Sequence, residues 1–356
     1  MACSRRSSST RSAGFVLAVT LWMLAGMAVV VGLISLWALE EVRAASEQQA
    51  NLDEQLLMVG TRDTVLYLAA TRDLTLAGLP VVPLAQDEFA SRRLEEFGAL
   101  RRDPVGGELL LDGTLYLGLP GIDFSIQDEA GLVSLVWPRD YEVDRFLQSQ
   151  RVPSAQVPGL RDALLDYVDE DQLSRLAGAE AREYERAGRA APPDRRLLLP
   201  MELLGVWGWS ELPAETRRLL PQQVTTTYSG PVNLNTAPPD LLPTWIAGCP
   251  ATCDMLLLRR SQKPFINSVE LQTQVGVTLP GDDGTDYRYM ASDALRLTFS
   301  GSSGAALRMH VRLTPLADQK APWSIIATYP VPRPASNATP KSTDSPLFAD
   351  PSPDRS

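Results

Sequence analysis

A long apolar segment near the N-terminus constrains this chain most. Residues 15 to 39 (FVLAVTLWMLAGMAVVVGLISLWAL) contain no charged side chain. As an α-helix this segment would be about 37 Å long, which is enough to cross the apolar core of a bilayer with some tilt. The segment therefore predicts a membrane span.

The charges on either side of the span predict its orientation. Three arginines precede it and two glutamates are the first charges after it (Arg5, Arg6, Arg11, Glu40, Glu41). Positive flanks remain in the cytoplasm, so we expect a single-pass protein whose larger part is exported. A cleaved secretory signal is the alternative, with a cleavage site near Ala44 and Ala45. Its apolar core would be only about 7 to 15 residues long, which favours a retained span.

Composition and charge narrow the classes of function. The chain has 356 residues, of which 44% are hydrophobic and 21% charged, so it can bury cores for two or three domains. The formal net charge is −10, and loss of the three arginines before the span would leave −13. Binding to phosphate backbones depends on clustered Lys and Arg, and we see no such cluster. We therefore expect no nucleic-acid partner for the exported part.

Histidine and cysteine are too sparse to predict an enzyme. The single histidine, His310, lies in an expected strand, where we predict a surface position rather than a catalytic role. No Gly-x-Ser-x-Gly nucleophile motif occurs. Cys3 stands apart, whereas Cys249 and Cys253 are close enough to form a local disulfide in an oxidising compartment. A zinc site would need further ligands of these types.

Residues 40 to 143 show helical and then strand patterns. Apolar residues recur at helical spacing to residue 72, so the span is expected to continue as an amphipathic helix. A charged helical pattern follows at 84–102. The segment 108–118 contains Asp112-Gly113 between apolar runs, which predicts a β-hairpin. A second strand pair is expected over 123–136, around Glu129-Ala130-Gly131.

Residues 144 to 276 show short helical stretches interrupted by prolines, and strand patterns return after them. Strands are expected at 294–299, 307–313 and 323–329, the first two forming a hairpin around the Gly-Ser-Ser-Gly loop. The residues from 331 onward are rich in Pro, Ser and Asp, which predicts a disordered tail. A helix-rich part thus interrupts a strand-rich one.

The segment 231–242 (PVNLNTAPPDLL) predicts a local helical unit. Asn235 or Thr236 is suited to cap a helix that begins near Pro238, with a second helix at 254–260. This is the pattern of a helix-hairpin-helix. Its Gly248-Cys249-Pro250 turn lacks one backbone donor, which disfavours phosphate binding. Because three basic residues follow the turn, nucleic-acid binding by this unit remains the less favoured alternative (Arg259, Arg260, Lys263).

An acidic stretch at 163–184 is the candidate ion site. It places several carboxylates within 18 residues, and the candidate ligands are Asp166, Asp169, Asp171, Glu180 and Glu183. Several hard oxygen ligands suit calcium better than a transition metal, although the spacing is not that of an EF-hand. The alternative is an ordinary solvated acidic surface.

The junction Ser12-Ala13-Gly14-Phe15 resembles the type III leader of pilins and pseudopilins. The resemblance implies that a prepilin peptidase cuts after Gly14 and methylates the new terminus at Phe15. Most of that family carry a glutamate at the fifth mature position, where this chain has Val19. Val19 and the Leu21-Trp22 pair resemble the K class of minor pseudopilins of the type II, or general, secretion pathway.

Three internal stretches extend this resemblance to the K class. Residues 126–135 are similar to its acidic turn, but with Ser134 and Val136 where asparagines are usual. Residues 163–184 resemble its acidic loop, with Ala181 in place of an acidic residue. Residues 231–242 resemble its Asn-x-Asn-Thr-Ala-Pro segment. The resemblance implies calcium in the helix-rich domain, bound by residues of the acidic stretch.

We therefore expect an α+β fold with a long N-terminal helix, a pseudopilin antiparallel sheet and a large helical insertion containing the helix-hairpin-helix-like unit. The expected parts follow in chain order: leader 1–14, helix 15–72, sheet domain 73–143, insertion 144–285, C-terminal strands 286–330 and tail 331–356.

The expected function is that of a non-enzymatic minor pseudopilin at the tip of a periplasmic pseudopilus, anchored in the inner membrane. The expected partners are the other minor pseudopilins, the major pseudopilin and prepilin peptidase. Val19 removes the carboxylate that would engage a subunit above, which favours the tip. A minor type IV pilin and a membrane-anchored DNA-binding protein are the alternatives.

Overall fold

The computed structural model describes residues 13–81, 103–302, 304–314, 321–332 and 347–348. Two compact units divide the chain, residues 1–56 and residues 57–356. Most of the expected leader, the helical pattern at 84–102 and most of the expected tail lie outside the described residues.

Helix α1 (Ala13–Thr71) forms the described part of the first unit and continues into the second. Residues 15–39 are exposed along their whole length. Within the described ranges, α1 is the one helix long and apolar enough to cross a membrane. The hydroxyls of Thr20 and Ser35 bond to carbonyl oxygens of the same helix, so the apolar segment leaves neither unsatisfied.

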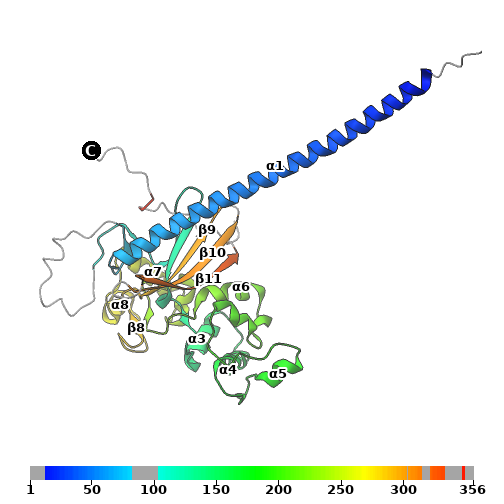
Figure 1. The fold of residues 1–356 in the computed structure, drawn as a ribbon. Helices are drawn as coiled ribbons and strands as arrows, with labels where there is room; N and C mark the ends of the chain where they lie inside the picture. The colour runs from blue at the N-terminus through cyan, green and yellow to red at the C-terminus, as the bar shows by residue number, and fades with distance from the viewer. Residues whose placement is uncertain (1–12, 82–102, 303, 315–320, 333–346, 349–356) are drawn as a thin grey trace, which may run out of the picture. The chain divides into compact units, whose positions relative to one another are not determined.

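The second unit is built on a five-stranded antiparallel sheet in the order β11-β10-β9-β4-β3. Figure 1 shows β9, β10 and β11 side by side. The strands comprise β3 (Asp112–Leu117), β4 (Asp123–Asp128), β9 (Ala294–Ser300), β10 (Ala305–Leu313) and β11 (Trp323–Pro332).

Strict alternation along the central strands gives the sheet one apolar and one polar face. On β9, Leu295, Leu297 and Phe299 enter one core, whereas Arg296, Thr298 and Ser300 line a cavity on the other side. Residues from the last turns of α1 share the apolar core with the sheet (Val65, Leu66, Leu68, Ala69). Burial of these side chains holds the C-terminal end of α1 against the sheet.

A large insertion separates β4 from β9, which are neighbours in the sheet. Its α-helices are α3 (Asp140–Ser149), α4 (Val157–Val168), α5 (Ala181–Arg186), α6 (Ala214–Gln223), α7 (Ala251–Gln262) and α8 (Ser268–Val275). Short 3-10 helices join them: η2 (Glu129–Gly131), η3 (Pro200–Gly205), η4 (Trp209–Glu211) and η5 (Pro239–Thr244).

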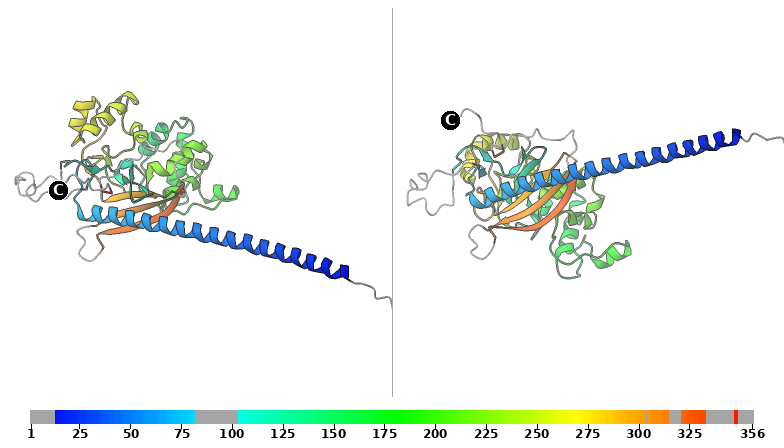
Figure 2. Two further views of the ribbon diagram at one scale, coloured as in Figure 1. Left: turned by 90° about the horizontal axis from the view of Figure 1, so that it is seen from above. Right: turned by 45° about the horizontal axis from the view of Figure 1, so that its top comes forward.

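The insertion has its own hydrophobic core. Trp209, Phe146, Leu164 and Leu241 are fully buried in it. Figure 2 shows the insertion helices on the side of the sheet away from the C-terminal end of α1. The predicted α+β class, with a long apolar helix, an antiparallel sheet and further helices, is therefore confirmed.

Both predicted hairpins before the insertion are wrong. Strand β2 (Glu108–Leu109) pairs with β1 (Leu79–Pro80), not with β3. Asp112 accepts bonds from the backbone N–H and the hydroxyl of Thr114, and a register shift follows it, so Asp112-Gly113 forms an irregular strand entry. The hairpin that forms joins β3 to β4.

The other error lies at Glu129-Ala130-Gly131, which forms η2 instead of a hairpin turn. Strand β5 (Val133–Ser134), which follows it, pairs in parallel with β6 (Val224–Thr225) inside the insertion. A second parallel pair joins β7 (Val232–Asn233) to β8 (Tyr287–Arg288).

The predicted hairpin of the C-terminal strands is confirmed, because β9 and β10 pair without a register shift. Strand β11 continues to Pro332, so the expected start of the tail at residue 331 is wrong by two residues. Val331 and Pro332 pair with Ala306 and Ala305. Proline is tolerated there because β11 is an edge strand.

Candidate functional site

A buried carboxylate, Asp128, joins the sheet to the insertion. It ends β4 and is fully buried. Its two oxygens accept bonds from the Asn233 amide (2.9 Å), the Thr236 hydroxyl (2.9 Å), the Ser292 hydroxyl (2.6 Å), and the backbone N–H groups of Ala130 and Ser292 (both 3.1 Å). Burial raises the pKa of Asp128, and these hydrogen bonds oppose that shift. We call these residues the Asp128 cluster.

The Asn-x-Asn-Thr-Ala-Pro segment supplies two of the five hydrogen bonds to Asp128, which corrects its predicted role. Asn235 and Thr236 cap no helix, and the helix after them is the 3-10 helix η5, interrupted by Pro243. The Asn235 amide bonds instead to the backbone of Phe265 and Tyr289. The polar side chains of the segment therefore connect parts of the insertion with one another, through Asn235, and with β4, through Asn233 and Thr236.

A glycine allows the acidic turn to meet this segment. A Cβ on Gly131 would lie 2.5 Å from the Thr236 carbonyl oxygen and 2.9 Å from the nitrogen of Ala237. Only hydrogen fits between these backbones. The acidic turn and the Asn-Thr-Ala-Pro segment, far apart in sequence, are thus two sides of one contact.

Glu129 forms a second buried cluster, with Arg296, His310 and Tyr329. Its carboxylate lies 3.2 Å from two guanidinium nitrogens of Arg296 and 2.6 Å from Nδ1 of His310. Nε2 of His310 lies 2.8 Å from the Tyr329 hydroxyl. Burial would raise the pKa of Glu129, but the Arg296 charge and the His310 bond outweigh it and hold that pKa at about 2.

His310 is therefore not the surface residue that we predicted, because only 1% of it is exposed. Burial lowers the pKa of His310, which favours the neutral ring. The Glu129 carboxylate can only accept, so Nδ1–H donates to it, and in the neutral ring Nε2 accepts from the Tyr329 hydroxyl. Arg296 also donates to the carbonyls of Gln222 and Val224, which ties β9 to the insertion.

The acidic stretch runs from the end of α4 through a loop to the start of α5. Arg175 donates to Asp166 and Asp169, both at 2.6 Å. A Cβ on Gly178 would lie 1.9 Å from an Asp166 oxygen, so a glycine is required where the loop passes this carboxylate. Arg175 thus neutralises Asp166 and one oxygen of Asp169.

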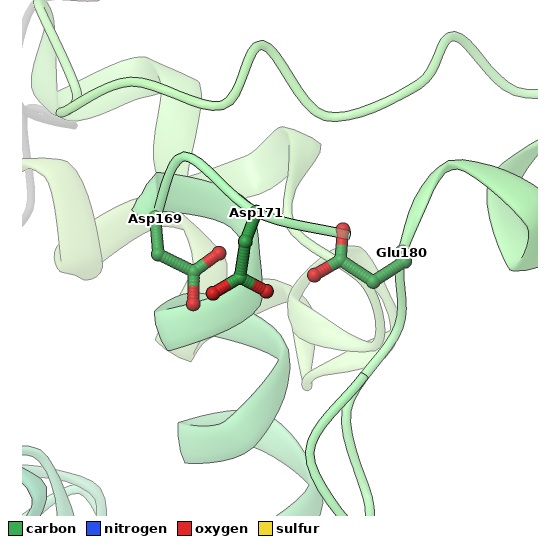
Figure 3. Close-up of side chains that lie close together, drawn as sticks. All are labelled: Asp169, Asp171 and Glu180. Atoms are coloured by element: carbon green, nitrogen blue, oxygen red, sulfur yellow. The ribbon is translucent and has the colours of Figure 1, made fainter. Parts of the chain in front are cut away.

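Three predicted calcium ligands converge in this loop. One carboxylate oxygen from each of Asp169, Asp171 and Glu180 lies within 4.8 Å of the others (Figure 3). We call these residues the acidic cluster. Glu183, by contrast, accepts from the backbone N–H of Glu180 and pairs with Arg186, which directs it to the start of α5.

The acidic cluster contains buried oxygens without a partner among the described residues. Glu180 is 3% exposed, and neither side-chain oxygen accepts a hydrogen bond; Oδ1 of Asp169 is also buried and unpartnered. Burial, together with the charges of Asp166, Asp169, Asp194 and Asp171, raises the pKa of Glu180 to about 7. Orphaned, mutually repelling carboxylate oxygens are the donor set that a hard divalent cation satisfies, so the residues fit calcium.

Asp194 is the residue that the sequence analysis missed. Its Oδ1 is buried without a partner, while Gln172 donates to its Oδ2 at 2.7 Å. Its left-handed backbone (φ 49°) in a Pro-Pro-Asp turn is the available sequence signal, since Asp tolerates that conformation.

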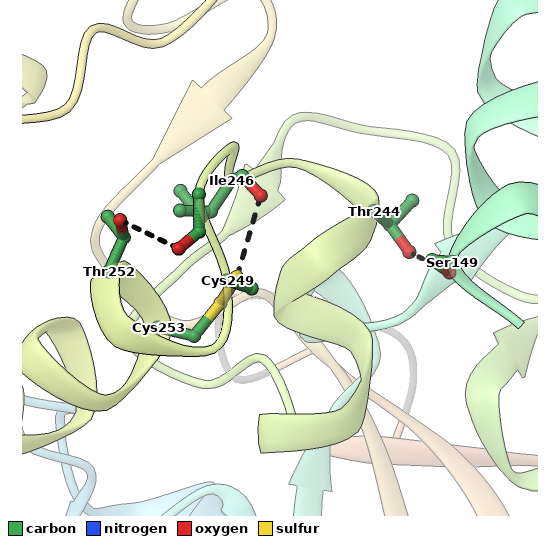
Figure 4. Close-up of a disulfide and its surroundings, with 7 residues drawn as sticks. Ser149, Thr244, Ile246, Cys249, Thr252 and Cys253 are labelled. Carbon is green, nitrogen blue, oxygen red and sulfur yellow. Dashed lines mark hydrogen bonds between the residues drawn. A yellow bond between two sulfur atoms is a disulfide. The ribbon is translucent and has the colours of Figure 1, made fainter.

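Cys249 and Cys253 are joined by a disulfide across the turn from η5 to α7 (Figure 4). In the same view, the hydroxyls of Ser149 and Thr244 lie 2.9 Å apart and connect α3 to η5. Arg260 donates to the carbonyls of Leu234 and Ala237, and Lys263 pairs with Glu270. Arg260 and Lys263, two of the three basic residues that the DNA-binding alternative needs to bind the phosphate backbone, therefore have partners within the protein.

Comparisons with known proteins identify a distant structural likeness. No family model matches the chain, and no curated protein matches it. The structure is similar to a chain in the crystal structure of the GspK-GspI-GspJ complex from the enterotoxigenic Escherichia coli type 2 secretion system. The identity is 14%, the TM-score is 0.47, and the match covers 82% of this chain and 99% of that chain.

Proposed function

We propose that this protein is a minor pseudopilin of a type II secretion system that helps to initiate the periplasmic pseudopilus and caps its tip. The observation that carries the proposal is helix α1. Its first part is apolar and exposed over 15–39, and its last turns pack on the sheet. One helix can then store the subunit in the bilayer and later pack among partner helices as the pseudopilus forms.

Two features favour the tip over the shaft. Val19 replaces the carboxylate that, in the pilin resemblance, neutralises the terminal ammonium of a neighbouring subunit; an unpaired charge in an apolar bundle is costly. The insertion between β4 and β9 adds a second core to the subunit. Such bulk is easier to accommodate at an end than between regularly repeating subunits.

Co-purification tests the proposal against a minor type IV pilin. Full-length tagged protein, extracted in mild detergent, is expected to retain the other minor pseudopilins of its own secretion system. Retention of a major type IV pilin instead would contradict the assignment. Observation of this subunit within the pseudopilus shaft would contradict the tip position.

The structure weakens the DNA-binding alternative, because Arg260 and Lys263 bond to groups of the protein itself. Arg260 is largely buried, and burial lowers its pKa. Salt-sensitive DNA binding by the full chain at low ionic strength would revive that alternative.

We also propose that calcium binds in the acidic cluster, where Asp169, Asp171 and Glu180 would hold it and Asp194 would complete the set. When bound, the ion supplies positive charge that offsets the repulsion among these carboxylates. The consequence is a fixed connection between the end of α4 and the start of α5.

Glu180→Gln tests this calcium proposal, with exposed Glu185→Gln on the same helix as the matched control. In EDTA, Glu180→Gln is expected to raise Tm slightly, because it removes a repelled carboxylate. Millimolar calcium is expected to raise the Tm of the wild type and the control by several degrees, but not that of Glu180→Gln. An equal calcium response in all three proteins would contradict the site.

A further inference from the structure

The outer edge of the sheet offers an unpaired strand. Strand β11 lies at the end of the strand order and pairs only with β10 among the described residues. It is ten residues long, and most of its side chains are exposed, including Ile325 (50%) and Ile326 (46%). A long exposed edge with apolar side chains is a template for an added strand.

Prolines limit this template to one half of β11. Pro330 and Pro332 pair with Leu307 and Ala305 in unbroken register, so their missing N–H groups are those on the open side of the strand. Neither residue can donate to an added strand. The first six residues of β11, from Trp323 to Thr328, contain no proline and keep every backbone N–H, and their register against β10 shifts once, between Ala327 and Ile325.

A cationic hollow lies beside this open half. Its volume is about 290 Å³, and its walls come from Ser324 and Ile326 of β11, from Thr226 and Thr227, and from residues 196–198 and Arg312. The ionisable lining residues are Arg196 and Arg312, with no carboxylate among the lining. Nε of Arg312 is buried and makes no hydrogen bond among the described residues, although it forms an ion pair with Asp293 at 3.9 Å, and another guanidinium nitrogen donates to the Thr227 carbonyl.

Strand addition combines backbone pairing, which gives affinity, with pockets for alternate side chains, which give specificity. Here the hollow beside the strand has the charge that receives a carboxylate. We propose that residues 323–328 of β11 pair with an extended segment of a partner pseudopilin, and that an acidic side chain of this segment enters the Arg196–Arg312 hollow. The inference rests on the proposed function, because it places the partner among pseudopilin subunits.

Hydrogen exchange on the full chain tests the surface directly. The probe is the set of other minor pseudopilins of the same secretion system, co-expressed as full chains and purified in detergent. We expect the outward-facing amides of residues 323–328, which do not donate to β10, to exchange at least about tenfold more slowly in the complex than in the free protein. Unchanged exchange in a complex that forms would overturn this inference and leave the proposed function standing.

Two variants target the two parts of the surface. Thr328→Pro removes one outward donor while keeping the pairing with β10, because Thr328 occupies the same alternating position as Pro330. The double variant Arg196→Glu, Arg312→Glu reverses the charge of the hollow. Each is expected to weaken the complex about tenfold or more, whereas Arg218→Glu, an exposed charge reversal on α6, is expected to leave it unchanged.

The remaining outcomes are also decisive. Circular dichroism and Tm establish that the variants are folded, and wild-type affinity in both folded variants would overturn the inference. Slow exchange of 323–328 in the free protein, lost on truncation after Pro332, would identify the C-terminal residues of this chain as the occupant and overturn it as well. If the wild type binds none of the minor pseudopilins, the proposed function fails and the inference fails with it.

Discussion

Asp128 and Glu129 are adjacent in the chain and both fully buried, yet they belong to different clusters. Asp128 collects hydrogen bonds from the insertion, whereas Glu129 pairs with Arg296 and His310. A water-accessible carboxylate pair is therefore not formed. The sequence shows that both residues are acidic, but their partners lie more than a hundred residues away and depend on tertiary packing.

His310 predicts a specific pH dependence. Its folded pKa is lowered by burial, so below about pH 6.5 the unfolded chain binds a proton that the folded protein does not. Stability is expected to fall as the pH drops through this range, by up to about 1.4 kcal/mol per pH unit. Glu129, Arg296, Arg308 and Tyr329 surround the ring, and the first stays charged throughout.

Urea unfolding of the wild type and His310→Gln between pH 5 and pH 8 measures this effect. Because His310 is the only histidine of the chain, the difference between the two proteins isolates its contribution. The variant is expected to lose less stability than the wild type on acidification. Parallel pH profiles would contradict a buried neutral imidazole.

Gly131→Ala tests the close contact between the acidic turn and the Asn-Thr-Ala-Pro segment. A methyl group 2.5 Å from the Thr236 carbonyl oxygen forces backbone displacement, so we expect a loss of about 2 to 4 kcal/mol. Gly159→Ala is the control, because its nearest neighbour would be 3.8 Å away. Equal stability of the two variants would show that the contact is loose.

At the scale of elements, the sequence predicted the long helix and the C-terminal strands well and the short connections poorly. Strands β9 and β10 alternate strictly between two faces, and that period is visible in the sequence. The Asp112-Gly113 pair has a strong hairpin signal, but its side-chain bond to Thr114 gives an irregular strand instead. Turn chemistry is local, whereas the choice of partner strand is not.

Phe348 lies within the expected tail, and its packing on the sheet core is expected to stabilise the folded protein. Its ring lies edge-on to Phe124 with 5.8 Å between centroids, and Leu347 packs on the same core. We expect Phe348→Ala to cost about 1 to 2 kcal/mol in unfolding free energy, because the side chain is only partly buried. Trp137→Ala, which removes a 73% exposed ring, is expected to cost much less. A wild-type Tm for Phe348→Ala would contradict this contact.

At the scale of the whole molecule, the helical insertion and the sheet are joined where the chain passes between them. The insertion enters after β4 and leaves before β9, and both the Asp128 and Glu129 clusters lie at this junction. Periodicity and proline spacing predicted that a helical part interrupts a sheet. The clusters that join the two could not be predicted, because their members are scattered from residue 128 to residue 329.

The central claim is that α1 enters a pseudopilus after pilin-type processing, and the mature N-terminus tests it most directly. Mass spectrometry of the protein from membranes that contain prepilin peptidase is expected to show an N-methylated Phe15 as the first residue. An intact Met1 would reduce the protein to a membrane-anchored domain, and cleavage near Ala45 would make it a soluble export; either result would contradict the assembly mechanism.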